Sequence, residues 1–351
     1  MKTFFNVLFG VVFSSLTAQQ YGNEFLHIGV DAAALAQGGQ VTARIDNVNA
    51  AYWNPAGLLH VNRAELSLMH AAYFKNQAQL DYAAYAKKID ENASASVSLM
   101  RFGVDNIMNT TRLIDENGNV DYNRITYFSV ADYALTLSYA RKNVYKNLNA
   151  GVNIKLIYRH IGDFAEAFGF GFDIGLQYRL KSWQFGFVIK DATTTHTFWS
   201  FNEERLQEIR DAVQGLNQTR PDKHEMNLPM VQTGIMRKFR IRKDYGLAVE
   251  LGAQAYFYER EALIRSAGWS LEPGLGVQGD FKEKIFLRTG INNIYRTEIF
   301  GEKLWRFNPT AGVGIRFHYL HLDYAFTGFI ETGLQAHVFS VILDLRIFRK
   351  N

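Results

Sequence analysis

The chain contains no cysteine, no long apolar run and no block of like charges. Without cysteine no disulfide can hold the fold together, so an exported chain of 351 residues needs another source of stability, such as a closed hydrogen-bonded sheet. No apolar stretch reaches the about 18 residues of a membrane-spanning helix, which excludes a helical membrane protein. Lysine and arginine are scattered singly and the net charge is only +4, so the sequence gives little support to nucleic-acid binding.

A short apolar stretch does occur at the very start of the chain. It runs from Phe4 to Leu16, follows Lys2 and precedes the small residue Ala18, as in a secretory signal peptide. Leu16 at the minus-three position weakens the cleavage site slightly. We therefore predict that residues 1–18 are a signal peptide and that the mature chain is exported.

The rest of the chain has a hydrophobic period of two. In LNAGVNIKLIYRH (148–160) and FGFGFDIGLQYRL (168–180), apolar side chains alternate with polar side chains or glycine, which predicts strands with one apolar and one polar face. About fourteen such segments follow one another, most of them ten or more residues long. They are 64–74, 79–88, 93–103, 131–142, 148–160, 165–180, 182–192, 229–240, 245–258, 268–281, 284–295, 304–318, 319–328 and 335–348.

This number and length of strands are typical of an outer-membrane barrel. Alternate connections are short, and the two long ones, 104–130 and 193–228, fall on the same side of the predicted barrel. The sequence thus predicts an all-β fold: a single antiparallel up-and-down transmembrane barrel over 63–351, with both termini in the periplasm. A soluble β-sandwich is the alternative, although its strands are usually about half as long.

Two motifs resemble ligand sites but lie in the wrong context. GLGVQG (274–279) has the letters of a dinucleotide-binding fingerprint, yet the alternation of a strand continues through it, so its glycines more plausibly let the wall bend or let a plug approach it. IDENGNVDYN (114–123) has acidic residues spaced like calcium ligands but lacks the glycine position and the final glutamate of an EF-hand loop. An Asn-Gly turn is the simpler interpretation, and calcium stays a minor alternative.

No pattern in the sequence predicts catalysis. The nine histidines are dispersed without a metal-ligand pair, and no Gly-x-Ser-x-Gly elbow occurs. We expect a protein that is not an enzyme and that has no catalytic residue, no cofactor and no metal. An outer-membrane hydrolase is the third-ranked function.

The second long connection contains a short amphipathic helix in NEERLQEIRDAVQGL (202–216). Leu206, Ile209 and Val213 share one face of it. Two interpretations stay open: the helix folds back over the barrel mouth, or its apolar ridge binds a partner.

A proline corner precedes the first strand, at Trp53, Asn54, Pro55, Ala56 and Gly57. The preceding residues suit one turn of helix; Pro55 disfavours helix at Asn54, and Gly57 is expected to release the chain toward the wall. We predict that residues 19–62 form a hatch in the barrel lumen, shaped by this motif.

The hatch and barrel together resemble known families. FLHIGVDAAALAQGGQVTARIDNVNAAYWNPAGL (25–58) followed by about fourteen strands resembles the FadL-like superfamily, whose barrels carry an N-terminal hatch with an Asn-Pro-Ala motif. Within it, the chain resembles the PorV/PorQ family of the Bacteroidetes type IX secretion system. The segments similar to PorV-like members are RFGVDNI, TRLIDENGNVDYNRITYFSVADYALTLSYA, IKLIYRHIGDFAEAFGFGFDIGLQY and WQFGFVIKDAT.

This resemblance implies an outer-membrane component of type IX protein secretion and sorting. Its implied partners are translocon or attachment-complex proteins and secreted substrates with C-terminal sorting domains, bound by the extracellular loops, beside outer-membrane lipid. The alternative is a FadL-like transporter of hydrophobic small molecules. The predicted inward faces favour the first function, since they carry polar residues where a transporter needs an apolar site. These are Asp173, Arg179, Glu250, Gln254, Glu272, Arg288, Arg316, Asp323, Asp344 and Arg346.

Overall fold

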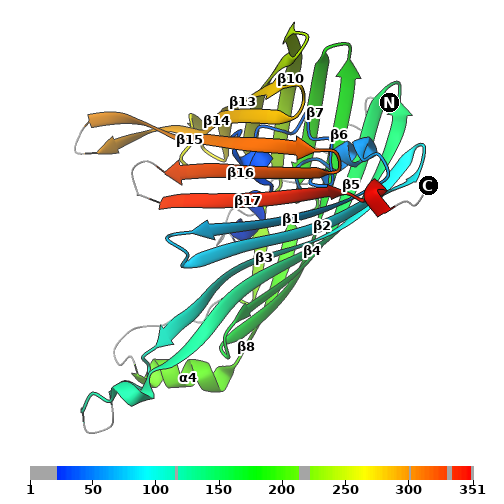
Figure 1. Ribbon diagram of the computed structural model, residues 1–351. Coiled ribbons are helices and arrows are strands. Elements are labelled where there is room, and N and C mark those ends of the chain that lie inside the picture. The colour runs from blue at the N-terminus through cyan, green and yellow to red at the C-terminus, as the bar shows by residue number, and fades with distance from the viewer. Residues whose placement is uncertain (1–21, 115–117, 213–221, 300–301, 330–333, 349–351) are drawn as a thin grey trace, which may run out of the picture.

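Fourteen antiparallel strands close into one barrel, in which each ring strand pairs with the next and β17 pairs with β1 (Figure 1). The computed structural model describes residues 22–114, 118–212, 222–299, 302–329 and 334–348. The ring strands are β1 (Ala64–Tyr73), β2 (Ala78–Asp90), β3 (Ala93–Asn109), β4 (Thr126–Tyr145), β5 (Leu148–Ile161), β6 (Ala165–Leu180), β7 (Trp183–Lys190), β10 (Met230–Arg242), β11 (Tyr245–Tyr256), β13 (Trp269–Phe281), β14 (Ile285–Ile299), β15 (Glu302–Phe317), β16 (Leu320–Phe329) and β17 (Leu334–Asp344). The predicted all-β barrel is confirmed, and the sandwich alternative is wrong.

Alternation along each strand separates an apolar outer face from a polar lumen. On β5, Val152, Ile154 and Leu156 are 43–48% exposed, whereas Asn153 and Lys155 between them are 1% and 5% exposed. The prediction was too long at the last strand: β17 ends at Asp344, and a 3-10 helix, η4 (Leu345–Phe348), follows it. No helix among the described residues is both long and apolar enough to cross a membrane.

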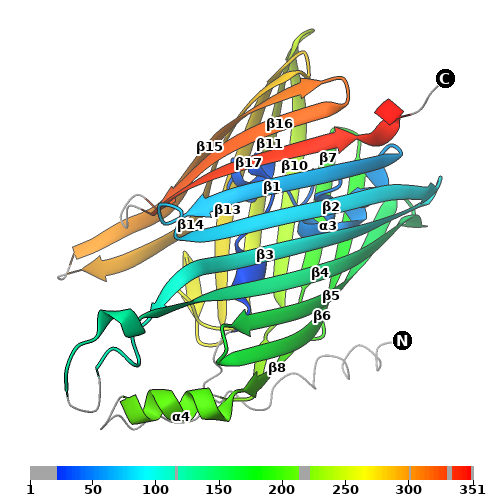
Figure 2. The same ribbon diagram turned by 60° about the horizontal axis from the view of Figure 1, so that its bottom comes forward.

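The two ends of the barrel differ in their connections. Tight turns such as Glu91–Asn92 and Lys146–Asn147 join strands at one end, which we call the short-turn end. At the other, the long-loop end, β3 and β4 extend beyond their neighbours (Figure 2). The 3-10 helix η3 (Tyr122–Arg124) and the helix α4 (Glu203–Ala212) also lie there. In the calcium-like motif Ile114 and Val120 form a β-bridge, and residues 115–117 between them lie outside the described residues.

Three further strands lie at the long-loop end: β8 (Thr195–Phe201), β9 (His224–Asn227) and β12 (Ile264–Ser266). β6 pairs with β7 along Ile174–Leu180 and with β8 along Ala165–Phe170. β7 and β8 therefore lie one after the other along the same side of β6, and the barrel wall has a break between them. At this break Asp191 and Thr194 have φ values of +54° and +63°. The predicted loop 193–228 therefore contains two strands of the wall.

The N-terminal segment fills the lumen as a plug, drawn in blue in Figure 1. Its short helices are η1 (Glu24–His27), α2 (Ala32–Leu35), α3 (Ala50–Trp53) and η2 (Pro55–His60). The plug starts at the long-loop end, where Asn23 Nδ2 donates to Thr197 Oγ1 at 2.7 Å and to Asn227 Oδ1 at 3.1 Å. The described chain thus starts at one end of the barrel and finishes β17 at the other. The side of the membrane on which each terminus lies stays a prediction.

Candidate functional site

The proline corner fixes the plug to the wall at β6. Asn54 has an extended backbone (φ −161°) and α3 ends at Trp53, as predicted, whereas the 3-10 helix η2 that begins at Pro55 was not predicted. Asn54 Oδ1 accepts from the Ala56 amide at 3.2 Å, while its Nδ2 donates to the carbonyls of Thr42 (2.8 Å) and Leu176 (3.0 Å). One fully buried amide therefore joins the corner, the preceding plug loop and the barrel wall.

Gly57 has another role than the predicted release of the chain. It lies inside η2, and a Cβ added there would overlap the Ile45 carbonyl and press on Ala50. Glycine is required because the plug folds tightly onto itself at this point. The neighbouring Trp53 ring is anchored by its Nε1, which donates to the Val30 carbonyl at 2.9 Å.

Inward-facing glycines bring the plug backbone into contact with the wall. Four of them stand directly opposite one another on adjacent strands: Gly186 on β7, Gly234 on β10, Gly252 on β11 and Gly274 on β13. A Cβ on Gly186 would overlap the Thr42 carbonyl of the plug. Glycine inside a strand is typical where another backbone approaches closely, so this glycine row is a seat for the plug.

Other glycines repeat the arrangement beyond this row. A Cβ on Gly151 would overlap the Pro55 carbonyl carbon, and one on Gly290 the Gln37 carbonyl. Within GLGVQG, Gly274 and Gly276 face plug residues, which confirms plug approach for those two, while Gly279 has nothing within 4 Å of its Cβ position. The motif lies entirely within β13, so it opens no helix.

Asp31 in the plug forms hydrogen bonds to β17 and β1. Its Oδ1 accepts from the Ala33 amide at 3.2 Å and from Ser340 Oγ at 3.1 Å, and its amide donates to Met69 Sδ at 2.9 Å. Burial, reinforced by the negative charge of Asp323, raises the pKa of Asp31 to about 6. The charged carboxylate is therefore disfavoured in the folded barrel at neutral pH.

We expect Asp31→Asn to stabilise the barrel at alkaline pH. Because the folded pKa is raised, the stability that Asp31 contributes is full below pH 4 and is lost as pH rises through 6. Asparagine accepts the same hydrogen bonds, tolerates the positive φ of 72° and carries no charge. The gain should be about 1–3 kcal/mol at pH 8 and near zero at pH 3. Urea titrations of the purified barrel at both pH values measure it; an equal gain at both would contradict this origin.

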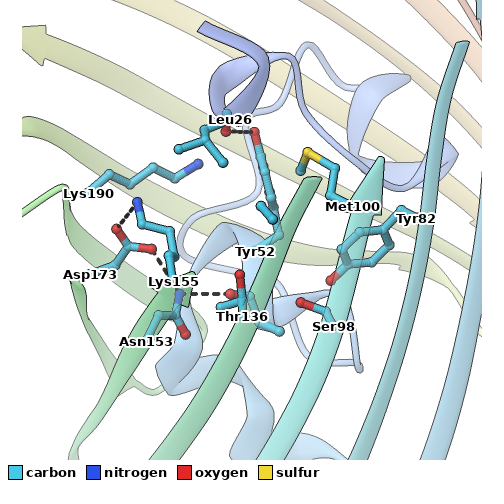
Figure 3. A pocket seen from close by; sticks show the side chains of 12 residues that line it. Leu26, Tyr52, Tyr82, Ser98, Met100, Thr136, Asn153, Lys155, Asp173 and Lys190 are labelled. Carbon is cyan, nitrogen blue, oxygen red and sulfur yellow. Dashed lines mark hydrogen bonds and ion pairs between the residues drawn. The ribbon is translucent and has the colours of Figure 1, made fainter. Parts of the chain in front are cut away.

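An ion-pair network lies at the wall break. Lys155 Nζ contacts Asp173 Oδ1 at 2.7 Å (Figure 3). It also contacts Asp191 Oδ1 at 2.5 Å, and all three side chains are at most 7% exposed. Asp191 Oδ2 lies 3.5 Å from Nε2 of His27 in the plug, and Thr195 at the start of β8 donates to Asp191 Oδ1. The network therefore connects β5, β6, the break and the plug.

A cavity of about 500 Å³ opens above the plug toward the long-loop end. Plug and wall supply its apolar side: Phe25, Ile28, Leu35, Tyr52, Trp53, Tyr73, Phe74 and Phe102. Amide side chains line much of the rest: Gln232, Gln254, Asn292, Asn293, Asn308 and Gln335. The carbonyl oxygens of Gln232, Asn292 and Asn308 have no hydrogen-bond partner among the described residues. The cavity is therefore amphipathic, with an apolar half that the predicted polar lumen did not include.

A second cavity, of about 680 Å³, lies below the plug and is strongly polar. Arg288 Nη1 pairs with Asp323 Oδ1 at 2.5 Å, and both Arg288 and Arg316 lie over the ring of Phe286. This end agrees with the polar, salt-bridged lumen that the inward faces predict. In the described part of the chain, no group of three or more histidine, cysteine or acidic side chains is arranged to hold a metal.

The candidate partner helix is only partly described. Leu206 and Ile209 lie in α4, Leu206 is partly buried, and Val213 lies outside the described residues. Asn202 Oδ1 accepts from the Arg205 amide at 3.3 Å at the start of α4. In Figure 2 this helix lies beside the β3–β4 extension at the long-loop end. Its two interpretations, cover or partner ridge, stay predictions.

Comparison with known proteins supports the fold. No protein-family model matches the chain, and no curated protein matches it. Among solved structures, the toluene transporter TodX of Pseudomonas putida is 13% identical, with a TM-score of 0.54 over 93% of this chain and 98% of that one. The toluene transporter TbuX of Ralstonia pickettii (11%, TM-score 0.52, 90% and 97%) and a Pseudomonas aeruginosa FadL homologue (12%, TM-score 0.51, 90% and 98%) are also similar. The chain thus has the fold of FadL-like outer-membrane barrels.

Proposed function

We propose that this barrel binds a small, partly apolar molecule in the cavity above the plug and takes part in its uptake across the outer membrane. The observation that carries the proposal is the cavity itself. Its volume of about 500 Å³ lies within the about 300–1,000 Å³ of ordinary ligand sites, and it combines an aromatic side with a few polar groups. The fold shared with TodX and TbuX, both described as toluene transporters, supports this function.

The polar inward faces favoured the secretion function over small-molecule transport. The apolar half of the cavity favours small-molecule binding instead. Most of the apolar half comes from the plug and from residues next to it, such as Tyr52, Trp53 and Phe102, rather than from the polar strand positions. The wall amides of the other half suit polar atoms of a ligand. A molecule with an apolar body and one polar end fits this division.

Filling the cavity should abolish binding. Thr327 on β16 lines the cavity, and Thr327→Trp is expected to lower the affinity for radiolabelled toluene at least about tenfold. Phe326→Trp is the matched control, because residue 326 is the neighbour of Thr327 and so points to the opposite, outer face of the same strand. Equilibrium binding to the purified barrel in detergent measures the effect. Equal binding by the wild type and Thr327→Trp would contradict the proposal.

A second candidate function is assistance to type IX secretion, with translocon, attachment-complex or sorting-domain proteins as partners. Two observations favour it: the sequence resemblance to the PorV/PorQ family, and the extension of β3, β4 and α4 beyond the barrel at the long-loop end (Figure 2). Exposed apolar side chains occur on this extension, including Met108 at 62%, Tyr122 at 73% and Tyr127 at 64%. Such side chains suit contact with a protein partner.

Purification from native outer membranes separates the two functions. A tagged barrel, an untagged control and a variant lacking 203–221 would be isolated in mild detergent and their co-purifying proteins identified by mass spectrometry. If the barrel assists secretion, translocon, attachment-complex or sorting-domain proteins should be enriched with the tagged barrel. The deletion of 203–221 should lower the amount of these proteins. Recovery of the barrel alone, from a preparation in which another known membrane complex survives, would exclude a stable partner.

A further inference from the structure

Lys190, the last residue of β7, is a buried cation without an anionic partner. The residue is 4% exposed, and its Nζ lies 3.9 Å from the ring centroid of Tyr52 (Figure 3). The ring centroid of Trp53 is 5.5 Å from the same Nζ. Among the described residues, no carboxylate lies within ion-pair distance of this ammonium. The nearby carboxylates of Asp173 and Asp191 are both bound to Lys155. The ring faces are thus the direct contacts of the charge, and the two carboxylates attract it only from a longer distance.

An unpaired ammonium is expensive to bury, and ring faces offset only part of that cost. A methionine of similar shape would avoid it entirely, so the chain retains a destabilising group where a hydrophobic one fits. Groups retained in this way in a cavity are candidates for binding. Lys190 lines the 500 Å³ cavity, so its charge is available to a ligand there.

The other basic side chains that line the cavity in the described part of the chain have partners. Arg260 Nε pairs with Glu272 Oε1 at 2.9 Å, and its guanidinium lies over Tyr256. His27 Nε2 lies 3.5 Å from Asp191 Oδ2. Among the described side chains that line the cavity, Lys190 is therefore the basic group without a carboxylate at ion-pair distance. Its position between Tyr52 and Trp53 places that anion beside aromatic faces.

We propose that the cavity selects aromatic carboxylates, with the carboxylate on the Lys190 ammonium and the ring against the aromatic side. The two plug rings, Tyr52 and Trp53, meet edge to face at 78° with centroids 4.9 Å apart, and Tyr73 and Phe102 complete this side. Flat rings pack well against such walls. The inference rests on the proposed function and names its substrate class, which differs from a plain hydrocarbon by one anionic group.

Calorimetric titration of the full-length barrel tests the inference. The probes are 3-phenylpropanoate, which is ionised at pH 7, and 3-phenylpropanamide, which has nearly the same shape and no charge. The wild type is expected to bind the acid at least about tenfold more tightly than the amide. Lys190→Met should bring the two affinities within about twofold of each other. Lys238→Met, at the rim of the cavity below the plug, keeps the same net charge as Lys190→Met and should leave the preference unchanged.

The outcomes separate this inference from the proposed function. Equal affinities of the wild type for acid and amide would overturn the role of Lys190 and leave small-molecule binding intact. Binding of neither probe, nor of toluene, would overturn both. Preference for the acid that persists in Lys190→Met would place the anion elsewhere. Should Lys190→Met fail to fold, the wild-type comparison of acid and amide still decides, with Lys190→Gln as the second variant.

Discussion

Gly186→Val is expected to unseat the plug and to destabilise the barrel by about 3–5 kcal/mol. A Cβ at this position overlaps the Thr42 carbonyl and crowds the amide of Ala43. The Ala43 amide donates to the buried carboxylate of Glu250 at 2.7 Å, so a displaced loop also loses this bond. Overpacking costs about 1–3 kcal/mol, and a buried polar group that loses its hydrogen-bond partner costs about 1–3 kcal/mol. Chemical denaturation of the purified barrel measures the sum.

The same wall provides a matched control. Gly279 on β13 has no atom within 4 Å of its Cβ position, so Gly279→Val should change the stability by less than about 1 kcal/mol. A displaced plug should also make Gly186→Val conduct ions in planar bilayers, whereas the wild type and Gly279→Val should conduct little. Equal stability and conductance of the two variants would show that the glycine row does not hold the plug.

The glycine row shows which parts of the fold a sequence can reveal. Alternation predicted the fourteen ring strands because the outer face is apolar along each of them. The corner at Asn54 and Pro55 was predictable because proline restricts the residue before it. The plug seat had a weaker signal: Gly186 and Gly234 lie on inward strand positions, but only the register of β7 against β10 shows that they stand opposite each other.

The wall break was not predictable from the same pattern. The polar run after Lys190 reads as the start of a loop, and Asp191 and Thr194 take positive φ values that favour glycine or asparagine. β8 then resumes the wall by pairing with β6, a long-range contact without a local signal. The apolar half of the cavity was missed for a related reason, since it depends on plug helices of four to six residues, too short for a periodic pattern.

The largest electrostatic effect is expected at the wall break, from Lys155→Met. This change leaves the carboxylates of Asp173 and Asp191, with side chains 5% and 0% exposed, without their shared cation. Removing one partner of a buried ion pair costs about 3–5 kcal/mol, because the remaining charge is uncompensated. Lys190→Met removes a neighbouring lysine that contacts no carboxylate, so it should leave the stability unchanged or raise it slightly. Both variants replace a buried lysine by methionine, so their free energies of unfolding can be compared directly by denaturation.

A double variant identifies the cause of the loss. Asp191→Asn removes one of the two carboxylate charges that Lys155→Met leaves unpaired. The barrel with both changes should therefore have a free energy of unfolding at least about 1 kcal/mol higher than Lys155→Met alone. A purely steric effect of methionine would give no such recovery. Loss without recovery, or equal losses in Lys155→Met and Lys190→Met, would mean that packing rather than charge holds the break closed. Recovery would show that the carboxylates of Asp173 and Asp191 destabilise the folded barrel when the ammonium of Lys155 is absent.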